Sequence, residues 1–133
     1  MSRLGGALKK QLPLFRLGVG GRLATGRQWL SPISLVDEVR AILWIIDHHL
    51  EGPFNLVSPT PLTNRDFTAE FGRALHRPTF ATVPEFALSA ALGRELVTLA
   101  LLASQRALPT RLVESGFTFE HRDMPSIIRA GLA

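Results

Sequence analysis

The stretch that decides the fold is Ser34-Leu-Val-Asp-Glu-Val-Arg-Ala-Ile-Leu-Trp-Ile-Ile-Asp-His-His49. Ser34 and Asp37 have the spacing of a capping box, in which each side chain bonds the other residue's backbone amide. Apolar residues then recur three and four positions apart, which predicts a helix to about His49 with one buried face. The predicted face consists of Val36, Val39, Ile42, Leu43, Ile46 and Leu50.

The segment after this helix has the pattern of a buried strand. Gly52-Pro53 ends the helix, and the run from Phe54 to Val57 is apolar and short. A lone strand cannot satisfy its own backbone hydrogen-bonding groups, so it needs partner strands. The preceding residues offer few candidates, which indicates that this segment ends a sheet whose other strands lie elsewhere.

Helices dominate the rest of the chain. Thr63 and Asp66 form a second predicted capping box, Pro84 suits the first turn of a third helix, and Asp123 can cap a last one. Phe80 to Val83 is expected to be extended, and Phe117-Thr-Phe119 alternates as a short strand does. The predicted fold class is therefore α/β and rich in helix, with few and short strands.

Composition narrows the cellular setting. The chain has 133 residues and no Cys, which excludes disulfides and thiolate metal sites and suits a reducing cytoplasm. Neither long apolar run, 41–46 or 99–103, approaches the roughly 20 residues of a membrane span. The first six residues lack the apolar stretch of a signal peptide, so we expect a cytoplasmic protein.

Positive charge is concentrated in the first 36 residues, which carry six basic and no acidic side chains. Three interpretations remain open: a solvated face, a site for an anionic small ligand, or a surface for nucleic acid or membrane. Only Phe15 and Trp29 interleave the charges, and no zinc-finger or RNA-binding signature follows. We therefore expect no nucleic-acid and no membrane partner.

Most catalytic signatures are absent. The cluster Gly18-Val-Gly20-Gly21 lacks the third glycine and the strand–helix setting of a dinucleotide fingerprint. The chain has no Tyr, and its only lysines are Lys9 and Lys10, so it has no Tyr–Lys acid–base pair. Its four histidines are not spaced as metal ligands. We predict no catalytic, cofactor-binding or metal-binding residue in this chain.

One polar cluster remains as a candidate, Gly26-Arg27-Gln28-Trp29. Arg27 offers a planar fork that suits phosphate or carboxylate, Gln28 an amide, and Trp29 a stacking surface. A surface loop with a partly buried Trp is the competing interpretation.

The order of these motifs resembles the epimerase-family proteins of the atypical short-chain dehydrogenase/reductase superfamily, close to NAD-dependent epimerase/dehydratases. The matching stretches are Gly5-Gly-Ala-Leu8, Pro13-Leu-Phe15, Gly18-x-Gly20-Gly21, Gly26-Arg-Gln-Trp29, Phe54-Asn-Leu-Val57, Pro59, Thr63-Asn64, Phe67, Gly72-Arg-Ala-Leu75, Arg77-Pro78, Val83-Pro84, Ala103-Ser-Gln-Arg106, Leu108-Pro109 and Gly116-Phe-x-Phe119. The chain departs from the family at Pro32, Ser34 and Val36, where the family has an aromatic residue, a His and an acid.

The resemblance implies a two-part organisation. Residues 1–58 would be the truncated C-terminal edge of a Rossmann-type domain, and residues 59–133 a small helical, substrate-side domain. It implies NAD(P) for the full-length relatives, bound by a Rossmann domain that would join this chain in cis or in trans. It also implies an anionic substrate beside Arg27, Gln28, Trp29 and Ser31, with Asn55 as a further candidate.

The expected function is thus the substrate side of an NAD(P)-dependent sugar-nucleotide epimerase-like oxidoreductase, inactive alone. Two alternatives stay open. The chain is a non-catalytic remnant or protein-interaction module, whose half-sheet would pair with another chain, or it is a basic binder of nucleic acid or membrane surfaces. Steep salt dependence of binding would mark the latter.

Overall fold

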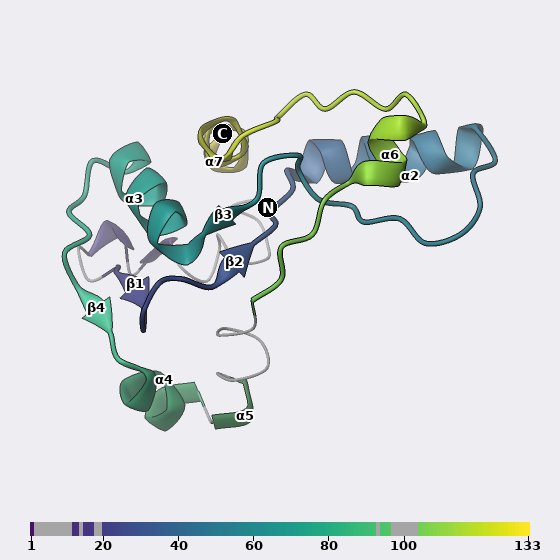
Figure 1. The fold of residues 1–133 in the computed structure, drawn as a ribbon. Helices are drawn as coiled ribbons and strands as arrows, with labels where there is room; N and C mark the ends of the chain where they lie inside the picture. The colour runs from purple at the N-terminus through teal and green to yellow at the C-terminus, as the bar shows by residue number, and fades with distance from the viewer. Residues whose placement is uncertain (2–11, 14, 18–19, 93, 97–103) are drawn as a thin grey trace. The chain divides into compact units, whose positions relative to one another are not determined.

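A computed structural model of the chain describes residue 1 and residues 12–13, 15–17, 20–92, 94–96 and 104–133. These residues form helices and two-residue strands (Figure 1). They divide into two compact units, each built from separated parts of the chain. The first unit comprises Met1–Lys10, Ser31–Pro61 and Ala107–Ala133, and the second comprises Gln11–Leu30 and Leu62–Arg106.

The longest helix of the first unit is α2, Leu35–Asp47. It begins as predicted, because the Ser34 hydroxyl accepts the Asp37 amide at 3.0 Å and satisfies one of the orphan donors of the first turn. The second half of the predicted capping box differs. The Asp37 carboxylate lies against the Ser34 hydroxyl and accepts amides from residues 120 and 121, which are distant in sequence.

The core of the first unit lies on one side of α2. Ala41 is fully buried, together with Leu112 and Phe117. Trp44, Ile45, Phe54, Leu56 and Phe119 pack around these three residues. The Trp44 indole also donates a 3.0 Å hydrogen bond to the Ser115 hydroxyl, so the polar atom of this large side chain is satisfied.

Three sequence-based predictions for this unit are wrong. The predicted buried face of α2 is exposed, and the helix buries the opposite side. Residues 54–57 and 117–119 form no strand, although Phe54 and Phe117 join the core. The physical reason is that a strand requires a partner backbone, and burial of alternate side chains does not provide one.

Two shorter helices complete the first unit. α6, Thr110–Glu114, ends at Gly116, whose φ of 93° lies in the left-handed region that closes a helix. α7, Met124–Leu132, begins at Asp123 with the predicted cap, in which the carboxylate accepts the Ser126 amide at 2.9 Å. α7 buries Met124, Ile127 and Ile128 on one face.

The second unit is built around two strand pairs. β1, Arg22–Leu23, pairs in parallel with β4, Thr82–Val83, and β2, Trp29–Leu30, pairs antiparallel with β3, Leu62–Thr63 (Figure 1). The helix α3, Asn64–Ala74, follows β3 directly. α4, Glu85–Leu92, and α5, Arg94–Leu96, follow β4.

Aromatic rings fill the core of the second unit. Phe67 and Phe71 lie one turn apart on α3 and are buried, as the sequence predicted. Phe15 packs on Phe71 with ring centroids 4.6 Å apart. Tilted rings at this distance have favourable quadrupole interactions beyond their buried area. The α3 helix is thereby packed against the segment that contains Phe15.

Candidate functional site

The loop between β1 and β2 is attached to the first turn of α3 by a set of short hydrogen bonds. The Leu23 amide donates to the Asn64 side chain at 2.8 Å. In return, the amides of Asn64 and Arg65 donate to the carbonyls of Gln28 and Gly26, each at 2.9 Å. The loop and the helix terminus therefore position each other.

Gly26 is required at the centre of this loop. Its φ is 69°, a conformation that costs about 1–2 kcal/mol for most residues with a Cβ. A Cβ at this position would also come within 3.1 Å of the Arg65 Cβ. The glycine therefore lets the loop approach α3 closely enough for its carbonyl to accept the Arg65 amide.

The amides at the start of α3 already have partners. Those of Asn64 and Arg65 bond the loop, and that of Asp66 donates to the Thr63 hydroxyl at 3.3 Å. A helix N-terminus often holds an anion through free amides. Here these three amides are occupied, so recognition of an anion at this place depends on side chains.

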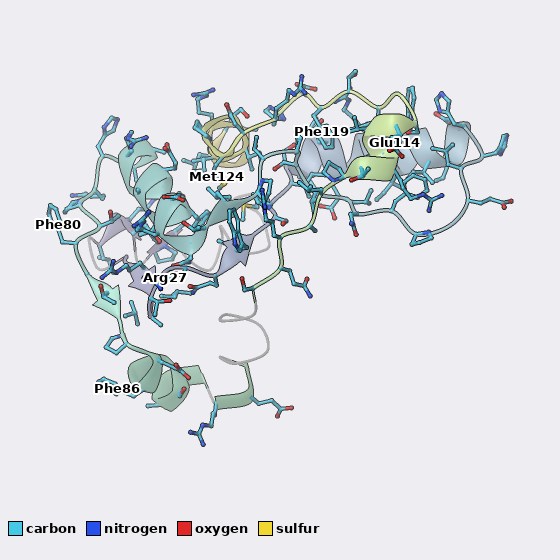
Figure 2. The ribbon with its side chains drawn as sticks, in the orientation of Figure 1. Arg27, Phe80, Phe86, Glu114, Phe119 and Met124 are labelled. Atoms are coloured by element: carbon cyan, nitrogen blue, oxygen red, sulfur yellow. The ribbon has the colours of Figure 1, made fainter. Side chains whose placement is uncertain are left out.

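Three arginines supply those side chains. A hollow of about 670 Å³ is lined by Arg22, Thr25, Gly26, Arg27, Trp29, Thr63 and Arg65, with no acidic residue among them. The Arg22 Nε donates to the Thr82 hydroxyl at 3.0 Å, which fixes the arginine's side chain along β4. Arg27 is exposed, as Figure 2 shows.

A second hollow of about 340 Å³ shares two of these arginines. It is lined by Arg22, Arg65, Thr68, Ala69, Thr79, Phe80 and Ala81. Arg22 and Arg65 thus line both hollows, and Phe80 is 95% exposed at the second (Figure 2). An aromatic ring belongs to the lining of each hollow, Trp29 in the larger and Phe80 in the smaller.

The sequence-predicted site residues have different surroundings. Arg27 and Trp29 line the larger hollow, and the Trp29 ring carries the Arg106 guanidinium 4.8 Å from its centroid. Gln28 is 7% exposed, and its amide donates to the Leu23 carbonyl at 3.1 Å, which holds the loop closed. Gln28 is therefore not part of the lining, and its contribution is to hold the loop whose residues line the hollow.

The other two predicted residues, Ser31 and Asn55, belong to the first unit, where both hold the segment that precedes α6. The Ser31 hydroxyl accepts the Ala107 amide at 3.0 Å. The Asn55 amide donates to the Leu108 carbonyl at 3.1 Å. Their contact with a substrate stays a prediction, and these bonds are their observed roles.

Sequence reasoning missed Arg22 and Arg65 as members of the cluster. Arg65 is 38 positions from Arg27, and the hydrogen bonds between the loop and the start of α3, including that from its own amide to the Gly26 carbonyl, bring it there. One signal for Arg65 was available in the sequence. Thr63 and Asp66 predicted a helix start, which places the Arg65 side chain in the first turn, next to any group bound at the helix N-terminus.

Among the residues that the structure describes, no group of three His, Asp or Glu side chains is placed to hold a metal. His48 stacks on Trp44 with ring centroids 3.7 Å apart. The His121 Nδ1 lies 3.1 Å from the buried Ser34 hydroxyl and 3.7 Å from Asp37, so the Ser and the Asp meet the same nitrogen. A Ser-His-Asp relay needs them on opposite nitrogens.

The described residues do not form the dinucleotide-binding fingerprint. In the nicotinamide-binding fingerprint, the glycines join a strand to a helix whose N-terminus faces the pyrophosphate. Here Gly20 and Gly21 are followed by β1, and no helix intervenes between β1 and β2. Residues 18–19, like the matching stretch at 5–8, lie outside the described residues.

Comparisons with known proteins point to one family. Residues 83–130 match the model described as "Domain of unknown function (DUF1731)". An epimerase family protein of Mycobacterium leprae is 48% identical over 122 residues, which are 91% of this chain and 39% of the relative. The epimerase family protein YfhF of Bacillus subtilis is 38% identical over 120 residues, 90% of this chain and 39% of the relative.

Two solved structures resemble the fold. The crystal structure of human epimerase family protein SDR39U1 with NADPH superposes with a TM-score of 0.90 at 29% identity, covering 98% of this chain and 44% of that one. The nucleoside-diphosphate sugar epimerase from Corynebacterium glutamicum gives a TM-score of 0.64 at 31% identity, covering 99% of this chain and 24% of that one. The chain thus spans well under half the length of these proteins.

Among the described residues, no helix has the length and apolar character needed to cross a bilayer.

Proposed function

Because this chain corresponds to the C-terminal part of epimerase-family proteins, we propose that it supplies the substrate side of an NAD(P)-dependent, sugar-nucleotide epimerase-like oxidoreductase. The organisation into an edge segment, 1–58, and a helical domain, 59–133, is part of this proposal, as is a cytoplasmic location.

The observation that carries the proposal is the arginine cluster of the second unit. Arg22, Arg27 and Arg65 line one hollow, and the acidic group beside it is Asp66, whose carboxylate lies 3.8 Å from the Arg65 Nε. Guanidinium groups form bidentate hydrogen bonds to phosphate and remain charged at any physiological pH. Three of them around one hollow suit a ligand with more than one negative charge, such as a diphosphate.

The aromatic rings extend this preference. Trp29 lines the same hollow, and Phe80 lines the one that shares Arg22 and Arg65. A ring that presents a π surface can stack on a nucleobase or cover the apolar side of a sugar. The proposed substrate therefore has a diphosphate centre between two ring systems. Thr25 and Thr63 add hydroxyl groups for orientation.

In this proposal, the catalytic groups are supplied from outside this chain. Nicotinamide supplies hydride transfer when it is bound in a complete enzyme of this kind. This chain contributes binding energy and orientation, which is how remote parts of a substrate assist a reaction. Ser31 and Asn55 remain proposed substrate neighbours on the first unit. In the complete enzyme they would position the segment that precedes α6, to which both are hydrogen-bonded.

Isothermal titration calorimetry of uridine diphosphate and of inorganic pyrophosphate into the chain tests the proposal. We expect Arg27→Ala to weaken diphosphate binding about tenfold or more, which corresponds to about 1.4 kcal/mol. Arg77→Ala is the matched control, because Arg77 is an exposed arginine of the same unit and lines neither hollow. Equal losses in both variants would reject the assigned site and leave only non-specific charge attraction.

A further inference from the structure

The smaller hollow of the second unit has a feature that binding of a diphosphate does not explain. Phe80 belongs to its lining and is 95% exposed, so nearly the whole ring meets solvent (Figure 2). A single exposed apolar side chain is common on protein surfaces and by itself indicates no function. Phe80 differs from such a residue because it lines its hollow together with Arg22 and Arg65, the two arginines that also line the larger hollow.

The backbone on either side of Phe80 packs closely against other parts of the second unit. A Cβ at Gly72, in the last turn of α3, would overlap the Thr79 side chain. A Cβ at Gly21, directly before β1, would overlap the carbonyl oxygen of Ala81. Phe80 lies between these two contacts, so its backbone is held while its ring stays in solvent. A side chain that is held in advance loses less entropy when a ligand binds.

The aromatic rings of the two hollows differ in how open they are. Trp29, in the larger hollow, has the Arg106 guanidinium over its ring at 4.8 Å from the centroid, so one face of the indole is covered. The Trp29 amide also donates to the Ser104 hydroxyl at 2.9 Å, which holds that neighbouring segment in place. Within the described part of the chain, no ring or guanidinium covers Phe80 in this way. A nucleobase stacks on an open π face, and Phe80 provides one.

The other residues of the smaller hollow suit a base and its adjoining phosphates. Thr68 and Thr79 line it, and each hydroxyl can both donate and accept a hydrogen bond, as the edge of a base requires. The Arg22 Nε donates to the Thr82 hydroxyl at 3.0 Å, which positions the guanidinium for phosphate. Because Arg22 and Arg65 belong to both linings, a diphosphate bound to them is next to both hollows.

We propose that the smaller hollow is the subsite for the nucleobase of a nucleoside diphosphate ligand, with the base stacked on Phe80 and the diphosphate on Arg22 and Arg65. The larger hollow, where Arg27 contacts the second phosphate, then receives the sugar attached to it beside the covered Trp29. The inference rests on the proposed function and deepens it by fixing the direction in which the ligand lies. Phe80 thereby selects a nucleoside diphosphate over a simple diphosphate.

The first experiment measures the affinities of uridine diphosphate and inorganic pyrophosphate by calorimetry. Phe80→Ala should weaken uridine diphosphate about tenfold, the scale of one base–aromatic stack, and pyrophosphate less than about twofold, because pyrophosphate has no base. Phe80→Trp retains a stacking surface and should bind uridine diphosphate as the wild type does. Phe86→Ala is the matched control, since Phe86 is 78% exposed in the same unit and lines neither hollow.

The second experiment locates the base directly. Uridine diphosphate that carries an azide on its base is bound to the chain and activated by light, and mass spectrometry identifies the labelled residues. We expect the label on residues 79–81, because a stacked base lies within contact distance of that segment. A label on residues 27–29 instead would place the base in the larger hollow and reverse the proposed direction.

Two calorimetric outcomes would also overturn the subsite. Either Phe80→Ala leaves the affinity for uridine diphosphate unchanged, or it weakens uridine diphosphate and pyrophosphate equally. In both cases the proposed function survives if Arg27→Ala still weakens both ligands. Failure of the proposed function has a different signature, in which neither ligand depends on Arg27, and the base subsite is rejected with it.

Discussion

Asp37 shows how one residue determines a local structure that the sequence only half reveals. Its side chain is fully buried and accepts four hydrogen bonds. The donors are the Ser34 hydroxyl at 3.2 Å, the Arg40 guanidinium at 2.7 Å, and the amides of Glu120 and His121 at 2.9 and 2.8 Å. A buried charge is tolerated when it is paired and hydrogen-bonded in this way. Asp37 thereby joins the start of α2 to the segment that precedes α7.

Asp37→Asn is expected to lower the free energy of unfolding by about 1–3 kcal/mol. The two backbone amides donate to different oxygens of Asp37, so an asparagine leaves one amide facing an NH₂ group. Chemical denaturation measures the change. Asp47→Asn, on the exposed last turn of the same helix, is the control and should change stability by less than about 0.5 kcal/mol. An equally small effect at Asp37 would show that its network contributes nothing.

At the scale of elements, the helices begin where short-range chemistry places them. Ser34, Thr63 and Asp123 each accept an amide from the residue three positions later. Such a cap needs only a side-chain oxygen and a helix-compatible sequence after it. Asp123 has the complete box, because the Ser126 hydroxyl also accepts the Asp123 amide at 3.3 Å.

The Asp123 cap of α7 is expected to make the stability of the protein depend on pH. The side-chain hydrogen bond with Ser126, and then the bond from its backbone amide, lower the pKa of Asp123 below its ordinary value. A lowered folded-state pKa means that the stabilisation is present above the ordinary value, near 4, and is lost as the pH falls through the folded-state pKa. Asp123→Ala should therefore cost about 1 kcal/mol at pH 7.

Denaturation of the wild type and of Asp123→Ala between pH 7 and pH 2 measures this effect. The difference in stability should shrink as the pH falls below about 4. Asp123→Ser provides the control, because a neutral cap cannot titrate and its difference from Asp123→Ala should stay constant. A gap between wild type and Asp123→Ala that does not change with pH would contradict the role of the carboxylate charge.

At the scale of the whole molecule, the chain combines an arginine-lined hollow in one unit with an uncovered helix face in the other. Neither feature serves the stability of the chain itself. Clustered arginines repel one another, and exposed apolar area favours association. Both features are explained if the chain is the substrate side of a larger epimerase-family fold, as proposed.

The chain alone should have no specific affinity for NADPH. No glycine-rich strand–helix turn occurs among its described residues, so we expect the phosphates of NADPH to contact the arginines of the hollow. We expect NADPH to bind no more tightly than uridine diphosphate, and Arg27→Ala to weaken both. Nicotinamide fluorescence measures the affinity. Micromolar binding that Arg27→Ala does not affect would reveal a cofactor site that this account lacks.

The part of the candidate site that was predictable from the sequence consists of residues close together along the chain. Arg27 and Trp29 stand in one short motif, and both line the hollow. Arg65, far from both in the sequence, enters it because hydrogen bonds such as that from its amide to the Gly26 carbonyl hold the start of α3 against the loop. Gln28 was expected beside the substrate, yet its amide closes the loop, since a buried amide must satisfy its hydrogen bonds within the protein.

The sequence by itself determined where α2, α3 and α7 begin, because capping involves groups within one turn. It also determined that Phe67 and Phe71 are buried, and that neither a disulfide nor a Tyr–Lys pair exists. Tertiary structure decided which apolar side of α2 is buried. Sequence periodicity identifies apolar faces of a helix, but it does not show which of two such faces packs against the core. It also decided that residues 54–57 and 117–119 are not strands. A strand is completed by hydrogen bonds to a neighbouring backbone, and only the folded chain shows whether that neighbour is there.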